Sequence, residues 1–189
     1  MPNQTHDPHR DPIGGLLAER HAKDAFFRSS PHSPIPAADR ASFAGLAYFA
    51  PDPALRFAGL TPGPYVGGGP ERFSIPTSDG GLRPARRAGS FRFELAGVDL
   101  VLTAYDLGGG SLFVPFLDAT SGTETYAAGR YLDLEPEPDG THVLDFNLAY
   151  HPYCAYSPQF SCPMTPAENR LPVRIEAGER LPDSGPGSH

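Results

Sequence analysis

The chain of 189 residues contains a single lysine, Lys23, so Schiff-base chemistry would have to use that residue. Neither glycine run, at residues 67–69 and 108–110, is followed by Lys and then Ser or Thr, which excludes a phosphate-binding P-loop. The motifs of serine hydrolases, zinc proteases, Cys-x-x-Cys redox proteins and dinucleotide-binding folds are also absent. No standard motif therefore identifies a reaction.

Long apolar runs and basic clusters are missing as well. No run approaches the roughly 20 apolar residues that a membrane span needs, and residues 1–12 are too polar for the apolar part of a signal peptide. The formal net charge is −7, and the longest basic cluster is Arg86-Arg87. Binding to nucleic acid without sequence preference needs several phosphate contacts. We therefore expect a cytoplasmic protein that binds neither nucleic acid nor membranes.

Proline and glycine, in contrast, are abundant, with 23 and 21 residues. They fall mostly between apolar runs, which is typical of a loop-rich globular protein. A chain of this length is expected to form one domain. We expect a disordered N-terminus at residues 1–10, a single β-rich domain at residues 11–180, and a disordered tail at residues 181–189.

The apolar pattern predicts one helix followed by strands. Residues 11–28 fit an amphipathic helix, and residues 37–46 are a shorter helical candidate. Strand-length runs follow at residues 72–75, 91–95, 100–102, 112–116, 131–134 and 143–146. Turn residues separate them at Asp79-Gly80, Ala96-Gly97, 108–110 and Asp139-Gly140. We expect a mainly β protein, an antiparallel meander that forms a small barrel or sandwich with the N-terminal helix packed on it.

Polar and ionisable side chains concentrate between residues 118 and 169. If Asp139-Gly140 is a two-residue hairpin turn, Leu134 pairs with Asp145, and Arg130, Asp145 and Asn147 share one face of the sheet. That face is otherwise apolar, so we expect Arg130 to be buried and paired with a carboxylate. The candidate ligand-binding residues are Asp118, Glu124, Tyr126, Arg130, Asp145, Asn147, Tyr150, Glu168 and Asn169.

Three functions fit these residues. The guanidinium of Arg130 could hold a carboxylate or phosphate, which predicts a pocket for a small polar or anionic ligand around Arg130, Glu124, Asp145 and Asn147. Glu124 with Asp145 or Asp118 could instead supply the acid and base of a hydrolase or isomerase. The same side chains could also form a buried network in a structural or partner-binding domain. We expect the first function, and we expect no cofactor.

Both cysteines, Cys154 and Cys162, lie in a loop that begins near His151. In the cytoplasm they are expected to be reduced thiols. Together with His151 they supply only three of the four ligands that a structural zinc ion needs, so we expect no metal. A nucleophile made of one cysteine and a histidine is a further alternative. We expect the loop at residues 150–169 to be ordered. Its expected contacts with the sheet are made by Tyr150, Tyr153 and Cys154.

The chain resembles domain-of-unknown-function family 1684, which is found in bacteria and archaea. The residues that carry the resemblance lie at 23–24, 43–46, 112–116, 118–126, 129–132, 144–154, 162–171 and 177–179. The chain differs from the family pattern at Ala127-Ala128, where glycine is usual, and at His151, where asparagine is common. The second difference weighs against the zinc site. The resemblance implies no activity, cofactor or catalytic residue.

Overall fold

The structure, a computed structural model, describes residues 12–182. The chain divides into two compact units, residues 1–46 and residues 47–189, and each is described by itself. The predicted disordered segment at residues 1–10, and most of the one at residues 181–189, lie outside the described residues. Leu181, at the start of the second segment, donates its backbone N–H to the carbonyl oxygen of Glu124 at 2.7 Å.

The first unit contains the predicted helix, α1 (Pro12–Ser29), and a 3-10 helix at Arg40–Ser42. The Asp24 carboxylate accepts a hydrogen bond from the backbone N–H of Leu46 at 3.0 Å, which ties the end of this unit to α1. The helix expected at residues 37–46 is reduced to the 3-10 turn, because the backbone is already extended at Phe43. No helix among residues 12–182 is long and apolar enough to cross a membrane. The packing of α1 on the sheet stays a prediction.

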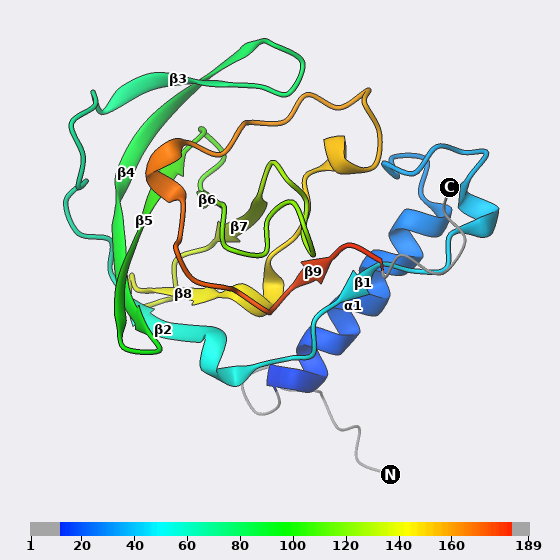
Figure 1. The fold of residues 1–189 in the computed structure, drawn as a ribbon, viewed down its shortest axis with the longest axis horizontal. Helices are drawn as coiled ribbons and strands as arrows, with labels where there is room; N and C mark the ends of the chain where they lie inside the picture. Colours follow the sequence, from blue (N-terminus) through cyan, green and yellow to red (C-terminus); the bar gives the residue numbers. More distant parts are fainter. Residues whose placement is uncertain (1–11, 183–189) are drawn as a thin grey trace. The chain divides into compact units, whose positions relative to one another are not determined.

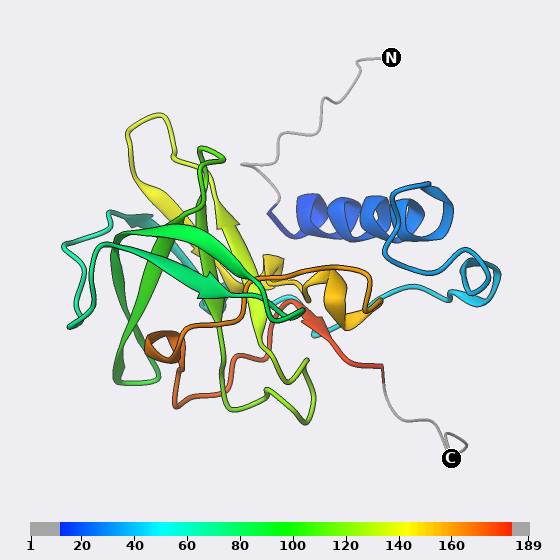
Figure 2. The same ribbon diagram turned by 90° about the horizontal axis from the view of Figure 1, so that it is seen from above.

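The second unit is built on a five-stranded antiparallel sheet with the order β3-β4-β5-β6-β7, which confirms the predicted meander (Figures 1 and 2). Its strands are β3 (Arg72–Pro76), β4 (Leu82–Leu95), β5 (Val98–Asp106), β6 (Leu112–Phe116) and β7 (Arg130–Leu134). Two short antiparallel pairs join it. They are β1 (Ala47–Tyr48) with β9 (Glu179–Arg180), and β2 (Arg56–Leu60) with β8 (His142–Asp145).

Both faces of the five-stranded sheet are covered by side chains. Alternate residues, such as Leu102 of β5 and Val114 of β6, point into the main core. The intervening positions of the same strands, such as Tyr105 of β5 and Phe113 of β6, point into a second core on the opposite face. Of the two predicted forms, a barrel or a sandwich, the sandwich-like arrangement fits, because the strands do not close into a barrel.

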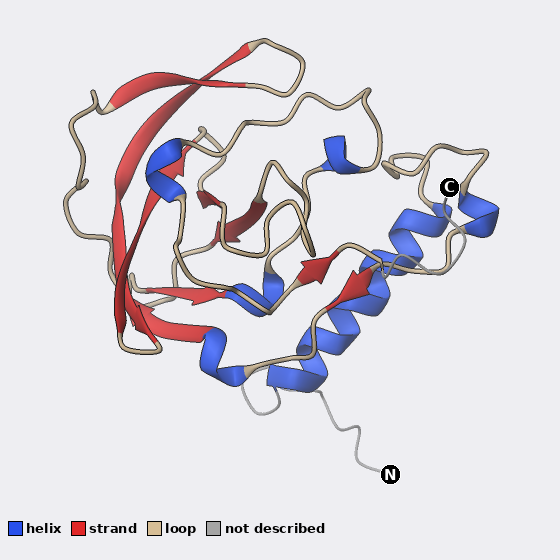
Figure 3. Ribbon diagram, viewed as in Figure 1, coloured by secondary structure: helices blue, strands red, loops and turns tan. Residues whose placement is uncertain are grey.

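A long loop segment, residues 146–178, lies along both edges of the open sheet (tan, with its short 3-10 helices in blue, in Figure 3). Isolated antiparallel bridges join Tyr150 to Tyr131 of β7 and Pro163 to Thr77 beside β3, so loop residues occupy both edges of the sheet. The loop contains 3-10 helices at Phe146–Leu148, Tyr153–Ala155 and Ala167–Asn169, and another precedes β2 at Pro53–Leu55. Its contacts in the second core come from Tyr150, Tyr153, Cys154, Phe160 and Cys162. The predicted packing of the loop on the sheet is confirmed.

The hairpin predicted at Asp139-Gly140 is correct as a turn and wrong as a strand pairing. The backbone N–H of Gly140 donates to the Glu137 carbonyl at 2.8 Å, which closes the turn. However, β8 pairs with β2, and β7 pairs with β6. Pro136 and Pro138 account for the separation, because neither has the N–H that a ladder between β7 and β8 would need.

The expected register fails for the same reason. Asp145 lies opposite Arg56 of β2 and not opposite Leu134. Asn147 lies outside the strand, in the 3-10 helix that follows β8. Arg130, Asp145 and Asn147 therefore do not share one sheet face.

Candidate functional site

Arg130 lies at the start of β7 and is fully buried. Its guanidinium donates to Asp118 Oδ1 at 3.3 Å and to the backbone carbonyl of Ile175 at 2.7 Å. It also donates to the backbone carbonyl of Glu179 at 3.2 Å and to that of Ala177. The prediction that Arg130 is buried and paired with a carboxylate is confirmed, with Asp118 as its partner.

Both carboxylate oxygens of Asp118 are used inside the protein. One accepts the backbone N–H of Ile175 at 2.8 Å, and Thr120 Oγ1 donates to the carboxylate at 2.8 and 3.0 Å. Burial lowers the pKa of Arg130, and the Asp118 carboxylate opposes that shift. The two side chains of the ion pair are 0% exposed, so no ligand can reach them without opening the core.

The other residues of the predicted pocket have separate partners. The Glu124 carboxylate forms an ion pair with Arg174 at the surface. The Asp145 carboxylate lies 3.4 Å from Arg56 Nε and accepts the backbone N–H of Asn147 at 2.9 Å. The structure therefore does not bring Arg130, Glu124, Asp145 and Asn147 around one pocket.

Glu168 and Asn169 fasten the long loop to the sheet. Glu168 Oε1 accepts from Tyr105 Oη at 2.9 Å and from Arg87 Nε at 3.0 Å. Asn169 bridges β5 and β6 through its side-chain amide. Its Oδ1 accepts the Thr103 N–H at 2.8 Å, and its Nδ2 donates to the carbonyls of Thr103 at 2.8 Å and Pro115 at 2.7 Å. Both residues hold the loop in place.

Tyr126 and Tyr150 also have partners within the protein. Tyr150 Oη donates to Asp133 Oδ2 at 2.5 Å, and burial together with this carboxylate raises the pKa of Tyr150. Tyr126 Oη lies 4.0 Å from Cys154 Sγ, as donor to that sulfur. Burial, with the Cys154 thiol beside it, raises the pKa of Tyr126.

Both ring nitrogens of His151 face other groups of the protein. Its Nε2 accepts the backbone N–H of Tyr126 at 3.2 Å, and its Nδ1 lies 3.9 Å from a carboxylate oxygen of Glu179. Within residues 12–182, no three His, Cys, Asp or Glu side chains are placed to hold a metal ion. Cys154 and Cys162 are free thiols.

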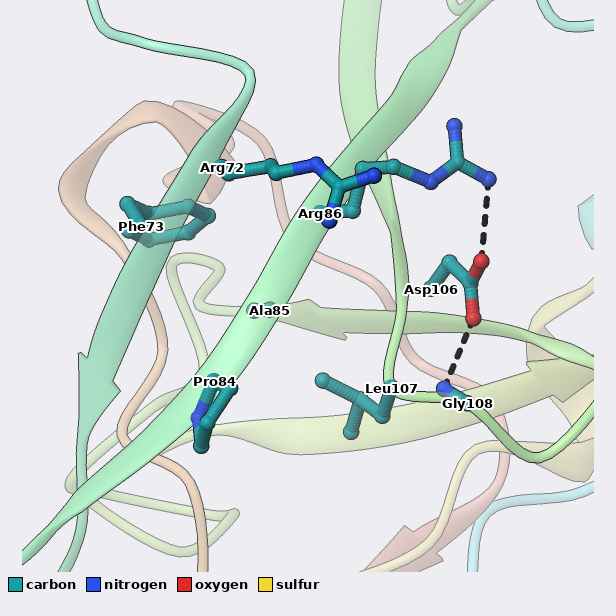
Figure 4. Close-up of a pocket in the computed structure, with 8 residues that line it drawn as sticks. All are labelled: Arg72, Phe73, Pro84, Ala85, Arg86, Asp106, Leu107 and Gly108. Carbon is teal, nitrogen blue, oxygen red and sulfur yellow. Dashed lines mark hydrogen bonds and ion pairs between the residues drawn. The ribbon is translucent and has the colours of Figure 1, made fainter.

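A pocket of about 380 Å³ lies elsewhere, at the end of β5 beside β3 and β4 (Figure 4). The residues that line it are Arg72, Phe73, Pro84, Ala85, Arg86, Asp106, Leu107 and Gly108. Phe73, Ala85 and Leu107 also belong to the second core, and the side chains of Phe73 and Ala85 leave the face opposite Arg72 and Arg86. Arg72 and Arg86 are directly opposite each other across β3 and β4, so both side chains leave the same face of the sheet.

The two pocket arginines differ in their partners. Arg86 Nη2 lies 2.9 Å from Asp106 Oδ2, and this carboxylate raises the pKa of Arg86. Asp106 Oδ1 accepts the Gly108 N–H at 2.7 Å, and this hydrogen bond, with Arg86, lowers the pKa of Asp106. Arg72 makes no hydrogen bond or ion pair with the residues that the structure describes. The lining contains two arginines and one aspartate, and Glu71, next to the pocket, also pairs with Arg86, with 3.7 Å between Oε1 and Nη1.

Sequence reasoning missed this pocket. Its charged residues lie in three different strands, and none of them forms a motif with a neighbour in the sequence. Arg86-Arg87 is the longest basic cluster in the sequence, but the two side chains leave opposite faces of β4. The arginine that lies opposite Arg86 across the two strands is Arg72.

Comparisons with known proteins agree with the resemblance. The sequence profile of a family described as "Protein of unknown function (DUF1684)" matches residues 41–180. The solution NMR structure of an uncharacterized protein from Haloarcula marismortui is similar to this chain, with 40% sequence identity and a TM-score of 0.68, over 94% of this chain and 98% of that chain. No curated protein matches. The chain belongs to the family of proteins of unknown function DUF1684.

Proposed function

We propose that this protein binds a small organic anion in the pocket at the end of β5. The observation that carries the proposal is the pair of Arg72 and Arg86, which face each other across two strands while only Arg86 has a carboxylate partner in the pocket. Like charges directly opposite each other destabilise a sheet. A bound carboxylate or phosphate would remove that repulsion, and the planar guanidinium of Arg72 suits such a group.

The rest of the pocket supports an apolar part on the ligand. Pro84, two residues before Arg86 on β4, leaves the same face as the arginine pair, and Leu107 lines the pocket as well. The volume of about 380 Å³ falls in the range of small-molecule sites. An anionic group attached to an aromatic ring, as in an aryl carboxylate or aryl phosphate, fits this combination of charge and apolar surface. The ligand class is the one predicted from the sequence, while Arg130 is replaced as its anchor by Arg72.

The pocket favours binding over catalysis by paired carboxylates. Its lining contains one carboxylate, Asp106, which is engaged by Arg86 and by the Gly108 N–H. Both contacts lower the pKa of Asp106, so the group stays ionised and is a poor proton donor at neutral pH. A hydrolase or isomerase mechanism with an acid and a base would need a second carboxylate there.

Isothermal titration calorimetry with benzoate and phenyl phosphate tests the proposal, with inorganic phosphate as a probe that lacks the apolar part. We expect the aryl anions to bind more tightly than phosphate, and binding to weaken as salt screens the arginines. Arg72→Gln should weaken binding about 10- to 100-fold, as for the loss of a charge-assisted hydrogen bond. The matched control is Arg92→Gln, an exposed arginine of β4 that lies opposite Val101 and outside the pocket.

Two results would contradict the proposal. One is an absence of heat with every probe for wild-type protein. The other is equal binding by wild type and Arg72→Gln. Either result would favour the structural or partner-binding alternative for this domain.

A further inference from the structure

The two cysteines of the long loop touch each other without being bonded. Both are free thiols. The backbone N–H of Cys154 donates to Cys162 Sγ at 3.4 Å. The Cys162 sulfur therefore lies against the backbone of Cys154, which is the kind of proximity that a disulfide between the two residues requires.

Contacts on both sides hold the cysteines in this arrangement. Cys154 lies in the 3-10 helix Tyr153–Ala155, and the ring of Tyr153 packs edge-on against Phe160 with 5.2 Å between centroids. Cys162 is fastened to the turn between β3 and β4, because Ser78 N–H donates to the Cys162 carbonyl at 2.9 Å and Cys162 N–H donates to Ser78 Oγ at 3.0 Å. The fold has therefore already brought the two thiols together.

The two thiols are not equivalent. Cys162 is 8% exposed, and burial raises the pKa of its thiol to about 11. Cys154 is half-buried, so a small reagent reaches it more easily. Cys154 is thus the thiol that reacts first with an outside reagent, and Cys162 is the thiol that reacts second, with Cys154.

We propose that Cys154 and Cys162 form a reversible disulfide by exchange with a low-molecular-weight disulfide. The Cys154 thiolate attacks one sulfur of the reagent, which gives a mixed disulfide and releases one small thiolate. Cys162 then loses its proton and attacks Cys154 Sγ, which forms the bond between the two cysteines and releases the second small thiolate. Two electrons pass from the protein to the reagent, and the two released thiolates take up the two protons.

Oxidised glutathione is the probe for the full-length protein, followed by mass spectrometry and thiol titration. We expect the wild type to lose two hydrogen atoms and both titratable thiols, without a stable glutathione adduct, and to recover both with dithiothreitol. The equilibrium constant for disulfide formation should exceed that of the denatured chain by about tenfold or more, because the fold holds the thiols together. A stable adduct on wild type, a disulfide-linked dimer, or an equilibrium constant equal to that of the denatured chain would overturn the proposal.

Single variants assign the order of attack. Cys162→Ser should accumulate one glutathione on Cys154, because the resolving thiol is gone. Cys154→Ser should react several-fold more slowly at the buried Cys162. Faster reaction of Cys154→Ser than of Cys162→Ser would refute this order, and circular dichroism shows whether each variant is folded.

Discussion

The charge of Arg130 is balanced by one carboxylate and three backbone carbonyls of the protein itself. Removing one partner of a buried pair leaves an uncompensated charge. We expect Asp118→Asn to lower the free energy of unfolding by about 3–5 kcal/mol, measured by urea denaturation. The control is Glu124→Gln, which breaks an ion pair with Arg174 whose side chains are 44% and 46% exposed. That change should cost about 1 kcal/mol or less, and equal losses in the two variants would contradict a sealed network.

Arg130 and the Arg72–Arg86 pair differ in how far the sequence alone predicts them. Arg130 stands among apolar neighbours in a strand, so its burial and its need for a carboxylate follow from local pattern. The Arg72–Arg86 pair depends on register, because the loop between β3 and β4 spans residues 77–81. A two-residue turn at Asp79-Gly80 would place Phe73 opposite Arg86, and Arg72 and Arg86 would then leave opposite faces.

The hairpin between β4 and β5 closes through two residues with positive φ, Ala96 at +51° and Gly97 at +78°. This conformation suits Asn-Gly turns, and alanine is strained in it. We expect Ala96→Asn to raise the free energy of unfolding by about 0.5–1 kcal/mol, read from thermal and urea melts. Ala119→Asn is the control, because Ala119 is exposed and has no positive φ. A similar gain at Ala119 would show that backbone conformation is not the cause.

Among the elements, the long strands were predictable and the short pairs were not. Alternation of apolar and polar residues marks β3 and β5 to β8 within a few residues of their observed bounds, while β4 begins nine residues before its predicted run at residues 91–95. β1 and β9 have two residues each, too few for any alternation, and they are defined by pairing with each other across most of the chain. β8 was found as a strand, but its partner β2 could not be identified from local pattern.

In the β unit as a whole, Asp79 joins segments that lie 82 residues apart, since its Oδ1 accepts from Thr77 Oγ1 at 2.5 Å and from Ser161 Oγ at 2.7 Å. These hydrogen bonds lower the pKa of Asp79 from 3.8 to about 2. Because the folded-state pKa lies below the unfolded one, the stabilisation is present above about pH 4 and is lost as pH falls through about 2.

The stability difference between wild type and Asp79→Asn should therefore shrink as pH falls from about 5 to about 2, in melting temperatures measured across that range. Asp99→Asn is the matched control, since the exposed Asp99 carboxylate makes no hydrogen bond with residues 12–182. If the difference in melting temperature between wild type and Asp79→Asn stays constant over this range, the charge of the Asp79 carboxylate does not contribute to stability.

The network around Arg130 also sets the order in which the main core can form. Its carbonyl acceptors, Ile175, Ala177 and Glu179, are synthesised 45, 47 and 49 residues after Arg130. A growing chain that has completed β3 to β7 contains Asp118 as a partner for Arg130 but still lacks these three carbonyls, so early burial of the guanidinium is penalised. We therefore expect the main core to close late, after residues 175–179 have been added to the chain.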